Sequence, residues 1–337
     1  MLTLTILVVL AALVFDFVNG FHDASNSIAT IVATRVLRPW QAVIWAAFFN
    51  FVALFFFGTE VAKTVGSGMV ALDTVTPMVI LAGLIGAVMW GLTTWWFGLP
   101  TSSSHALLGG YAGAAMISSA MRNGWSSFHD PIIIAGWSKT LLFIVLAPLA
   151  GLAIAHVLMR AVSVAQKRFP KEQSEKTFGY LQLCSSAFLS LMHGSNDAQK
   201  TAGIIAGALV AGGFHEQFVI PYWVLLASYG VMGLGTLFGG WRIVNTMGRR
   251  LTRLRPNGGF SAESSAALSI LTATLLGMPV STTQVTTGAI LGVGTARRLR
   301  AVRWGVAGRI VWAWVLTIPA SAAMASLVVA AAHLCGF

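Results

Sequence analysis

Long apolar runs separated by short polar loops occupy most of the chain. The clearest runs cover residues 42–57, 78–96, 132–158 and 219–238. Several of them approach or exceed the roughly 20 residues that a helix needs to cross about 30 Å of hydrocarbon. The pattern therefore predicts membrane-spanning helices. The run at 2–18 has neither the basic start nor the small-residue cleavage site of a signal peptide, so we expect it to be a retained span.

Two polar motifs interrupt this pattern, and each of them occurs twice in the same order. GFHDASNS at 20–27 corresponds to GSNDAQKT at 194–201, and GLPTSSSH at 98–105 corresponds to GMPVSTTQ at 277–284. One such match would carry little weight, but two in register indicate that the chain contains a duplication. The sequence therefore predicts two related halves.

The polar segment between the halves sets their boundaries. We predict a first transmembrane repeat at 1–160, a cytoplasmic linker at 161–177 and a second transmembrane repeat at 178–337.

Loop charges predict that the second repeat is inverted. The first motif segment is followed by Arg35 and Arg38, whereas the loop at 212–217, which follows the equivalent segment, has no Lys or Arg. Basic loops lie on the cytoplasmic side of a membrane, so equivalent loops of the two repeats fall on opposite sides. Inverted repeats of this kind are typical of secondary transporters.

Glycine and proline in the second motif pair break a helix, so we predict a helical hairpin with this motif at its tip in each repeat. Loop charge leaves open whether a hairpin crosses fully. Segments 1–34 and 178–211 are too long for one straight span, and we expect a break near Gly20 and Gly194. The predicted fold is an all-α integral membrane protein with two inverted repeats, broken helices and helical hairpins.

Composition excludes a soluble domain. Hydrophobic residues make up 56% of the chain and charged residues only 9%, whereas soluble domains carry about 25% charged residues. The net charge of +11 comes from basic loops near 160–176, 242–255 and 297–303, as the positive-inside rule requires, so no nucleic-acid partner is expected. Cys184 and Cys335 lie in apolar stretches and indicate neither a disulfide framework nor a metal site.

Asp23 and Asp197 fall inside apolar segments, one in each repeat. A carboxylate within the membrane is costly and therefore indicates a functional site. Capping of a helix start is the structural alternative. Asn19 and His22 precede Asp23, whereas His193 and Asn196 precede Asp197, so the two residue types have exchanged places around the acids. A pseudo-two-fold site would need such similar donors from both repeats.

The hydroxyl clusters at 101–104 and 281–283 lie just before predicted helices. Backbone N–H groups at a helix start, together with hydroxyl donors, form an anion site without fixed charge. Ordinary helix capping is the alternative. Lys200 follows Asp197 closely and either pairs with it or neutralises a bound anion. Glu263 begins the second hairpin, where an acid near a helix start is also a common structural feature.

These four motifs resemble the PiT family of inorganic phosphate transporters, over essentially the whole chain. The resemblance implies that Glu263 matches a family glutamate. His22 and Lys200 stand where sodium-coupled members have Asn, as in the bacterial low-affinity branch. Two sets of site residues are predicted. The phosphate set is Ser102, Ser103, Ser104, Ser281, Thr282, Thr283, Asn196 and Lys200; the cation or proton set is Asp23, Asn26, Asp197, His22, His193 and Glu263.

The predicted function is cation-coupled phosphate symport by alternating access in the bacterial cytoplasmic membrane. Two carboxylates and a phosphate would repel by several kcal/mol in a low-dielectric cavity, so cations must enter with the anion. A histidine gains a proton between about pH 5 and 8, which favours protons over sodium. Sodium, or a divalent metal that enters with phosphate, stays an alternative. No cofactor is expected, the partners are phosphate and lipid, and an oligomer is left open.

Two other classes of protein fit the sequence less well. An intramembrane hydrolase would use Ser104, His105 and an Asp, but Gln284 replaces the histidine in the second repeat. A cation channel is disfavoured because channels repeat by rotation about a pore, whereas inverted halves suit alternating access.

Overall fold

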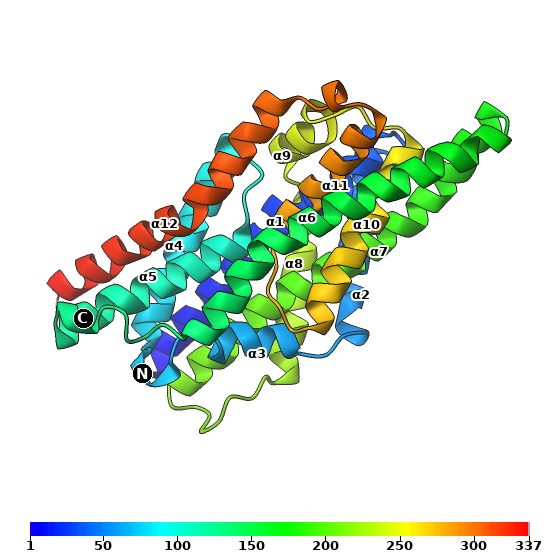
Figure 1. The fold of residues 1–337 in the computed structure, drawn as a ribbon. Coiled ribbons are helices and arrows are strands. Elements are labelled where there is room, and N and C mark those ends of the chain that lie inside the picture. Colours follow the sequence, from blue (N-terminus) through cyan, green and yellow to red (C-terminus); the bar gives the residue numbers. More distant parts are fainter. Residues whose placement is uncertain (336–337) are drawn as a thin grey trace.

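The computed structural model describes residues 1–335, apart from the side chain of Asp73, and its regular structure is helical. A single isolated bridge joins Val70 to Ile132. Figure 1 shows the arrangement. The helices of the first half are α1 (Leu2–Ala33), α2 (Pro39–Val52), α3 (Glu60–Ser67), α4 (Pro77–Trp96), α5 (Ser103–Asn123) and α6 (Ile134–Ala165). Those of the second half are α7 (Lys171–Ala211), α8 (Tyr222–Phe238), α9 (Trp241–Asn245), α10 (Pro256–Leu275), α11 (Thr282–Arg297) and α12 (Trp304–Leu334).

Local sequence explains where the hairpins begin and turn. Pro77 and Pro256 stand at the first position of α4 and α10, where a missing N–H costs nothing. Gly98 and Gly277 end these helices with φ of 64° and 67°, a left-handed conformation that glycine adopts without strain. The chain then returns in extended form, so that α5 and α11 begin inside the molecule (Figure 1).

Both halves therefore contain a long helix, a bent pair and a hairpin in the same order. The bent pair of the first half turns by 86° between α2 and α3, and that of the second half turns by 62° between α8 and α9. The predicted all-α fold with broken helices and hairpins is confirmed. The predicted linker at 161–177 is largely taken up by the end of α6 and the start of α7.

The predicted helix breaks near Gly20 and Gly194 are wrong, because α1 and α7 run through these residues without interruption. The two glycines instead allow close helix packing. A Cβ at Gly20 would collide with the Met232 carbonyl oxygen of α8, and a Cβ at Gly194 would collide with the Asn50 carbonyl oxygen of α2. Small residues let helix backbones approach in this way within membranes. At about 1.5 Å per residue, both helices exceed the ~30 Å hydrocarbon thickness and must tilt or project from it.

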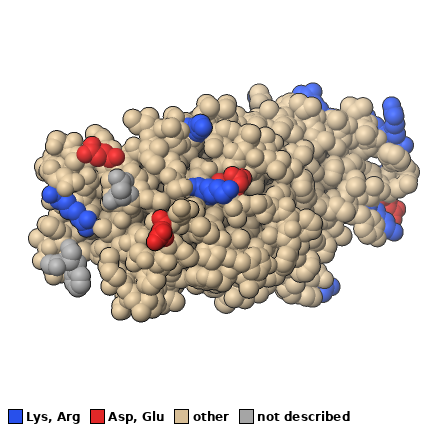
Figure 2. Space-filling view, turned by 90° about the horizontal axis from the view of Figure 1, so that it is seen from below, with Lys and Arg blue, Asp and Glu red and all other residues tan. Residues whose placement is uncertain are grey.

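The outer surface suits contact with lipid. Four helices are long and apolar enough to cross a membrane, or up to six if each bent pair counts as one span. Large apolar side chains such as Leu142 of α6 and Trp312 of α12 are exposed. Figure 2 shows a face that is mostly uncharged, with most Lys and Arg side chains toward its margins. The described part of the chain is therefore built as a multi-pass membrane protein.

Helix packing crosses the boundary between the sequence repeats. The first hairpin, α4 and α5, packs against α12, whereas the second, α10 and α11, packs against α6. Two large apolar cores result, one around each hairpin. Helices α1 and α7 each enter both cores. Phe15 lies in the first core and Ile28 in the second, while Met192 lies in the second core and Ile205 in the first. The polar motifs of α1 and α7 lie between these contacts, at the junction of the cores.

Candidate functional site

The site forms where four segments meet between the two cores. The middle of α1 and the middle of α7 supply the acidic motifs, and the first turns of α5 and α11 supply the hydroxyls. Because α5 and α11 begin inside the molecule, their first side chains reach residues that a surface helix end would not. Asp23 and Asp197 are both almost fully buried, at 1% and 0% exposure.

Asp23 receives three polar contacts from three different helices. Its Oδ1 atom lies 2.7 Å from His22 Nδ1. Ser103 of α5 donates to its Oδ2 atom at 2.6 Å, and Thr283 of α11 donates to Oδ1 at 3.2 Å. The hydroxyls of both hairpins therefore converge on one carboxylate of the first repeat.

Asp197 is held by a lysine and a histidine of its own helix. Lys200 Nζ donates to its Oδ1 atom at 2.6 Å and to the Val280 carbonyl oxygen at 2.8 Å, and it also bonds the Ser104 hydroxyl. His193 Nε2 lies 3.2 Å from the Oδ2 atom, although the pair lacks hydrogen-bond alignment. The predicted pairing of Lys200 with Asp197 is therefore present, and the same ammonium also ties α7 to both hairpins.

Each acid thus has a histidine from its own helix, but at a different spacing. His22 directly precedes Asp23, whereas His193 lies one helical turn before Asp197. The exchange of Asn and His between the two motifs explains this difference.

Asn26 and Asn196 connect the long helices to this hairpin. Asn26 Nδ2 donates to the hydroxyls of Thr282 and Thr283, at 3.1 and 2.9 Å. Asn196 Nδ2 donates to the Met278 carbonyl oxygen at 3.2 Å, and its Oδ1 accepts from the Val280 N–H at 3.3 Å. Thr282 also donates to Asp197 at 3.1 Å. The tip of the second hairpin is therefore fixed to both acidic motifs.

The six predicted hairpin hydroxyls divide into two groups. Ser102 and Ser281 are N-caps, and they accept from the N–H groups of His105 and Gln284 at 3.1 and 3.2 Å. The other four contact the acidic motifs or Lys200, and these are Ser103, Ser104, Thr282 and Thr283.

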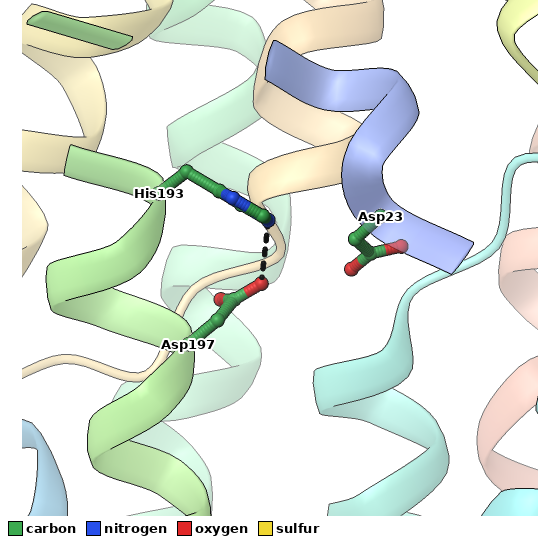
Figure 3. A group of neighbouring side chains, drawn as sticks. All are labelled: Asp23, His193 and Asp197. Atoms are coloured by element: carbon green, nitrogen blue, oxygen red, sulfur yellow. Dashed lines mark ion pairs between the residues drawn. The ribbon is translucent and has the colours of Figure 1, made fainter. Parts of the chain in front are cut away.

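Three ligand atoms are close enough to share a small cation. Asp23, His193 and Asp197 each offer one atom, and these atoms lie within 4.8 Å of one another. Figure 3 shows the side chains from α1 and α7 directed toward a common space. The Oδ1 atom of Asn26 has no hydrogen-bond donor. This set of oxygen and imidazole donors fits a metal ion or a proton.

The site is closed to a molecule as large as phosphate. A cavity of about 10 Å³ lies beside it, lined by Asn19, His22 and Thr101 among others. Such a volume holds about one water molecule. Entry of an anion therefore requires a hairpin tip to move away from α1 and α7.

Glu263 belongs to a separate polar group. It is fully buried in α10 and accepts from Thr30 at 2.5 Å, Gln182 at 2.8 Å and Ser185 at 2.6 Å. The structure therefore brings together thirteen of the fourteen predicted site residues in or beside one cluster and places Glu263 outside it.

The catalytic arrangement considered from sequence is not formed. Ser104 bonds Lys200 and the Val280 carbonyl oxygen, whereas His105 Nδ1 faces Gln284 at 3.3 Å. No bond joins Ser104 to His105 among the described residues.

One buried acid was missed by sequence reasoning. Asp16 of α1 is fully buried between the site and the first core. The sequence does contain a signal for this residue, because Asp16 is an acid within the apolar run at 2–18.

The helical fold, the lipid-facing surface and the enclosed polar site together define a multi-pass membrane transporter. The phosphate transporter family model matches residues 19–325. The chain is 52% identical, over 324 residues, to a probable low-affinity inorganic phosphate transporter of Rhizobium meliloti (strain 1021), with 96% of this chain and 95% of the relative covered. A protein of the same description from Bacillus subtilis (strain 168) is 41% identical over 330 residues, with 97% and 96% covered.

A solved structure described as the sodium-dependent phosphate transporter has the same fold. Its TM-score is 0.84 at 26% identity, and the match covers 98% of this chain and 99% of that one. The chain therefore belongs to the phosphate transporter family. The PiT resemblance drawn from the motifs is confirmed, and the chain is a transporter and not an enzyme.

Proposed function

We propose that the chain carries inorganic phosphate across the bacterial cytoplasmic membrane together with protons, by alternating access. The observation that carries the choice of proton is the position of Lys200. Its ammonium bonds Asp197 at 2.6 Å and the Val280 carbonyl oxygen at 2.8 Å. Those oxygen atoms would suit a sodium ion, but the lysine ammonium has only donors and occupies the place of a bound cation as a tethered positive charge.

Charge balance supports coupling to a cation. Asp197 is offset by Lys200, whereas Asp23 has only a histidine and hydroxyl donors beside it. Bringing a phosphate with one or two negative charges next to Asp23 is strongly unfavourable in a buried site. A proton on Asp23 or His22 would remove this repulsion, so binding of phosphate would draw a proton into the site.

Hydrogen bonding suggests how the proton and the phosphate bind together. The hydroxyls of Ser103 and Thr283 now donate to Asp23, and that of Thr282 donates to Asp197. Protonation weakens Asp23 as an acceptor, because hydrogen bonds to charged groups are the stronger ones. The released hydroxyls, with the first N–H groups of α5 and α11, would then hold the phosphate oxygens.

Asn196 and Lys200 complete the proposed phosphate set. Both residues contact the tip of the second hairpin, at Met278 or Val280. His193, Asn26 and Asp197 complete the proposed cation set around Asp23, whereas Glu263 would act from its separate position between α10, α1 and α7. The predicted repeats at 1–160 and 178–337 would move their hairpins in turn to open the site to either side.

Sodium or a divalent metal is the second candidate for the coupled cation. Two observations favour it. One ligand atom each of Asp23, His193 and Asp197 lie within 4.8 Å of one another, and the Oδ1 atom of Asn26 accepts no hydrogen bond. The structural relative described as sodium-dependent has a TM-score of 0.84, which is consistent with the same alternative.

Phosphate uptake by purified protein in proteoliposomes tests the proposal. With sodium and divalent metals absent and acid outside, we expect the imposed pH step to drive accumulation of labelled phosphate. Sulfate is the control anion. Negligible uptake under the pH step, restored by an inward sodium gradient alone, would show that sodium is the coupled ion and that Lys200 does not replace it.

A further inference from the structure

A second titratable group lies outside the cluster described above. Asp16 of α1 has 0% exposure, and neither of its carboxyl oxygens has a hydrogen-bond donor. The nearest polar neighbours are Asn19 of α1 and Thr201 of α7, but neither makes a bond of ordinary geometry with it. The Oδ1 atom of Asn19 and the Oγ1 atom of Thr201 are themselves without a partner. Several unsatisfied oxygen atoms therefore gather at one buried point.

Glu263 is another buried acid outside the central cluster, and its surroundings differ from those of Asp16. Glu263 is equally buried, yet it receives three hydrogen bonds, from Thr30, Gln182 and Ser185. Hydrogen bonds of this kind favour the charged form of a carboxyl group. Asp16 has no donor, and an isolated carboxylate charge in apolar surroundings is so costly that the group takes up a proton instead. The contrast indicates that Asp16 holds a proton in this conformation.

The charged groups around Asp16 provide no net compensation for a negative charge on it. Lys200 of α7 is the nearest cation, but its three N–H donors are taken by Asp197, Ser104 and the Val280 carbonyl oxygen. Asp197 adds negative charge. Tyr229 of α8 is the other titratable neighbour, and α2 and α4, which also pack on α1, contain no titratable side chain.

Four further titratable groups on α1 and on elements that contact it are engaged elsewhere. On α1 itself, His22 pairs with Asp23. Arg242 of α9 bonds the Trp96 carbonyl oxygen, Glu263 bonds Thr30 near the far end of α1, and His105 of α5 faces Gln284.

A small cavity lies between the neighbourhood of Asp16 and the proposed phosphate site. Asn19, one helical turn from Asp16, lines the cavity of about 10 Å³, and His22 lines the same cavity. His22 in turn lies 2.7 Å from Asp23. One water molecule in this cavity would connect the Asn19 amide to the imidazole.

We propose that Asp16, with Asn19 and Thr201, forms a second proton site, which carries the coupled proton beside the phosphate site. The proposal rests on the proton coupling proposed above. The proton binds to a carboxylate oxygen of Asp16 from water on one side of the membrane and leaves to water on the other, with no other bond made or broken. Ser190 stands at the equivalent position of the second repeat, so the site exists once per chain.

The test separates net transport from exchange, in sodium-free proteoliposomes. Asp16→Asn imitates the protonated side chain in shape and charge. We expect it to reduce phosphate uptake driven by a pH step by at least about tenfold, because a permanently neutral site cannot release a proton. Exchange of labelled for unlabelled phosphate at equal concentration on both sides should stay within about twofold of wild type, because exchange requires no proton release. Asp130→Asn, at an exposed loop acid, is the matched control.

Each outcome decides the proposal. The proposal is overturned if Asp16→Asn takes up phosphate as fast as wild type, with an unchanged number of protons per phosphate. It is also overturned if the folded variant loses phosphate exchange. If Asp16→Asn does not fold, Thr201→Val decides, because removing this neighbouring hydroxyl should move the pH of half-maximal uptake, and an unmoved profile is contrary to the proposal. If the wild-type protein takes up no phosphate under the pH step and requires sodium, the proton coupling itself is refuted, which is a distinct result.

Discussion

The contacts of Asp23 and Asp197 place both carboxylates at the centre of the proposed transport step. Replacing either residue with Asn keeps the side-chain shape but removes a charge that attracts cations. We expect each variant to insert normally and to lose most phosphate uptake in proteoliposomes. Asp130→Asn, on an exposed loop, should behave like wild type. Near-normal uptake by either site variant would refute the assignment of that carboxylate.

Lys200 is the residue whose replacement tests the choice of ion. In Lys200→Asn, the fixed positive charge on Asp197 is lost and a carbonyl oxygen takes its place, as in Asn26 of the first repeat. We expect weaker uptake under a pH step and a partial response to an inward sodium gradient, because an amide oxygen is able to coordinate sodium. Uptake is measured with each gradient alone. A variant with unchanged proton-driven uptake and no response to sodium would contradict the proposed role.

The sequence predicts most members of this candidate cluster because charged groups are rare in an apolar chain. Asp23, Asp197 and Lys200 stand out for that reason, and the repeat added the hairpin hydroxyls. Contacts between segments that lie far apart in the chain could not be predicted from the sequence. Nothing in the pattern distinguishes Ser102, which caps a helix, from Ser103, which bonds Asp23. Asp16 was passed over because it lies in a run interpreted as a simple span.

At the scale of the elements, the uninterrupted course of α1 and α7 is the main departure from expectation. Sequence shows a glycine beside a polar motif, and this is equally compatible with a break and with a close crossing. The choice depends on which helix lies opposite. Here the backbones of α8 and α2 lie against Gly20 and Gly194, so the glycines serve packing.

This packing predicts a graded loss of stability. Gly20→Val would push α1 away from the Met232 backbone, and we expect a destabilisation of about 1–3 kcal/mol, the usual cost of overpacking. The melting temperature in detergent should fall accordingly. Gly230→Ala is the matched control, because no atom lies within 4 Å of an added Cβ there. Equal melting temperatures for Gly20→Val and wild type would mean that the crossing is loose.

For the whole molecule, the repeats predict opposite orientations in the membrane. In a background without Cys184 and Cys335, single cysteines at Gln173 and Arg253 should react with an impermeant maleimide only from the cytoplasm. Cysteines at Asp130 and Glu216 should react only from outside. All four positions are exposed. Labelling of positions 130 and 253 from the same side would show that the halves are not inverted.

The exchange of partners between the halves has a consequence for biosynthesis. Hairpin α4–α5 packs on α12, which is translated well after it, and α1 packs on α8. When the first half leaves the ribosome, α4 can pack on α1 and α5, but the faces that later contact α8 and α12 are still uncovered. A nascent chain stalled after α6 would present the bare hairpin face to lipid or to an insertion chaperone, and quality-control proteases would meet it there.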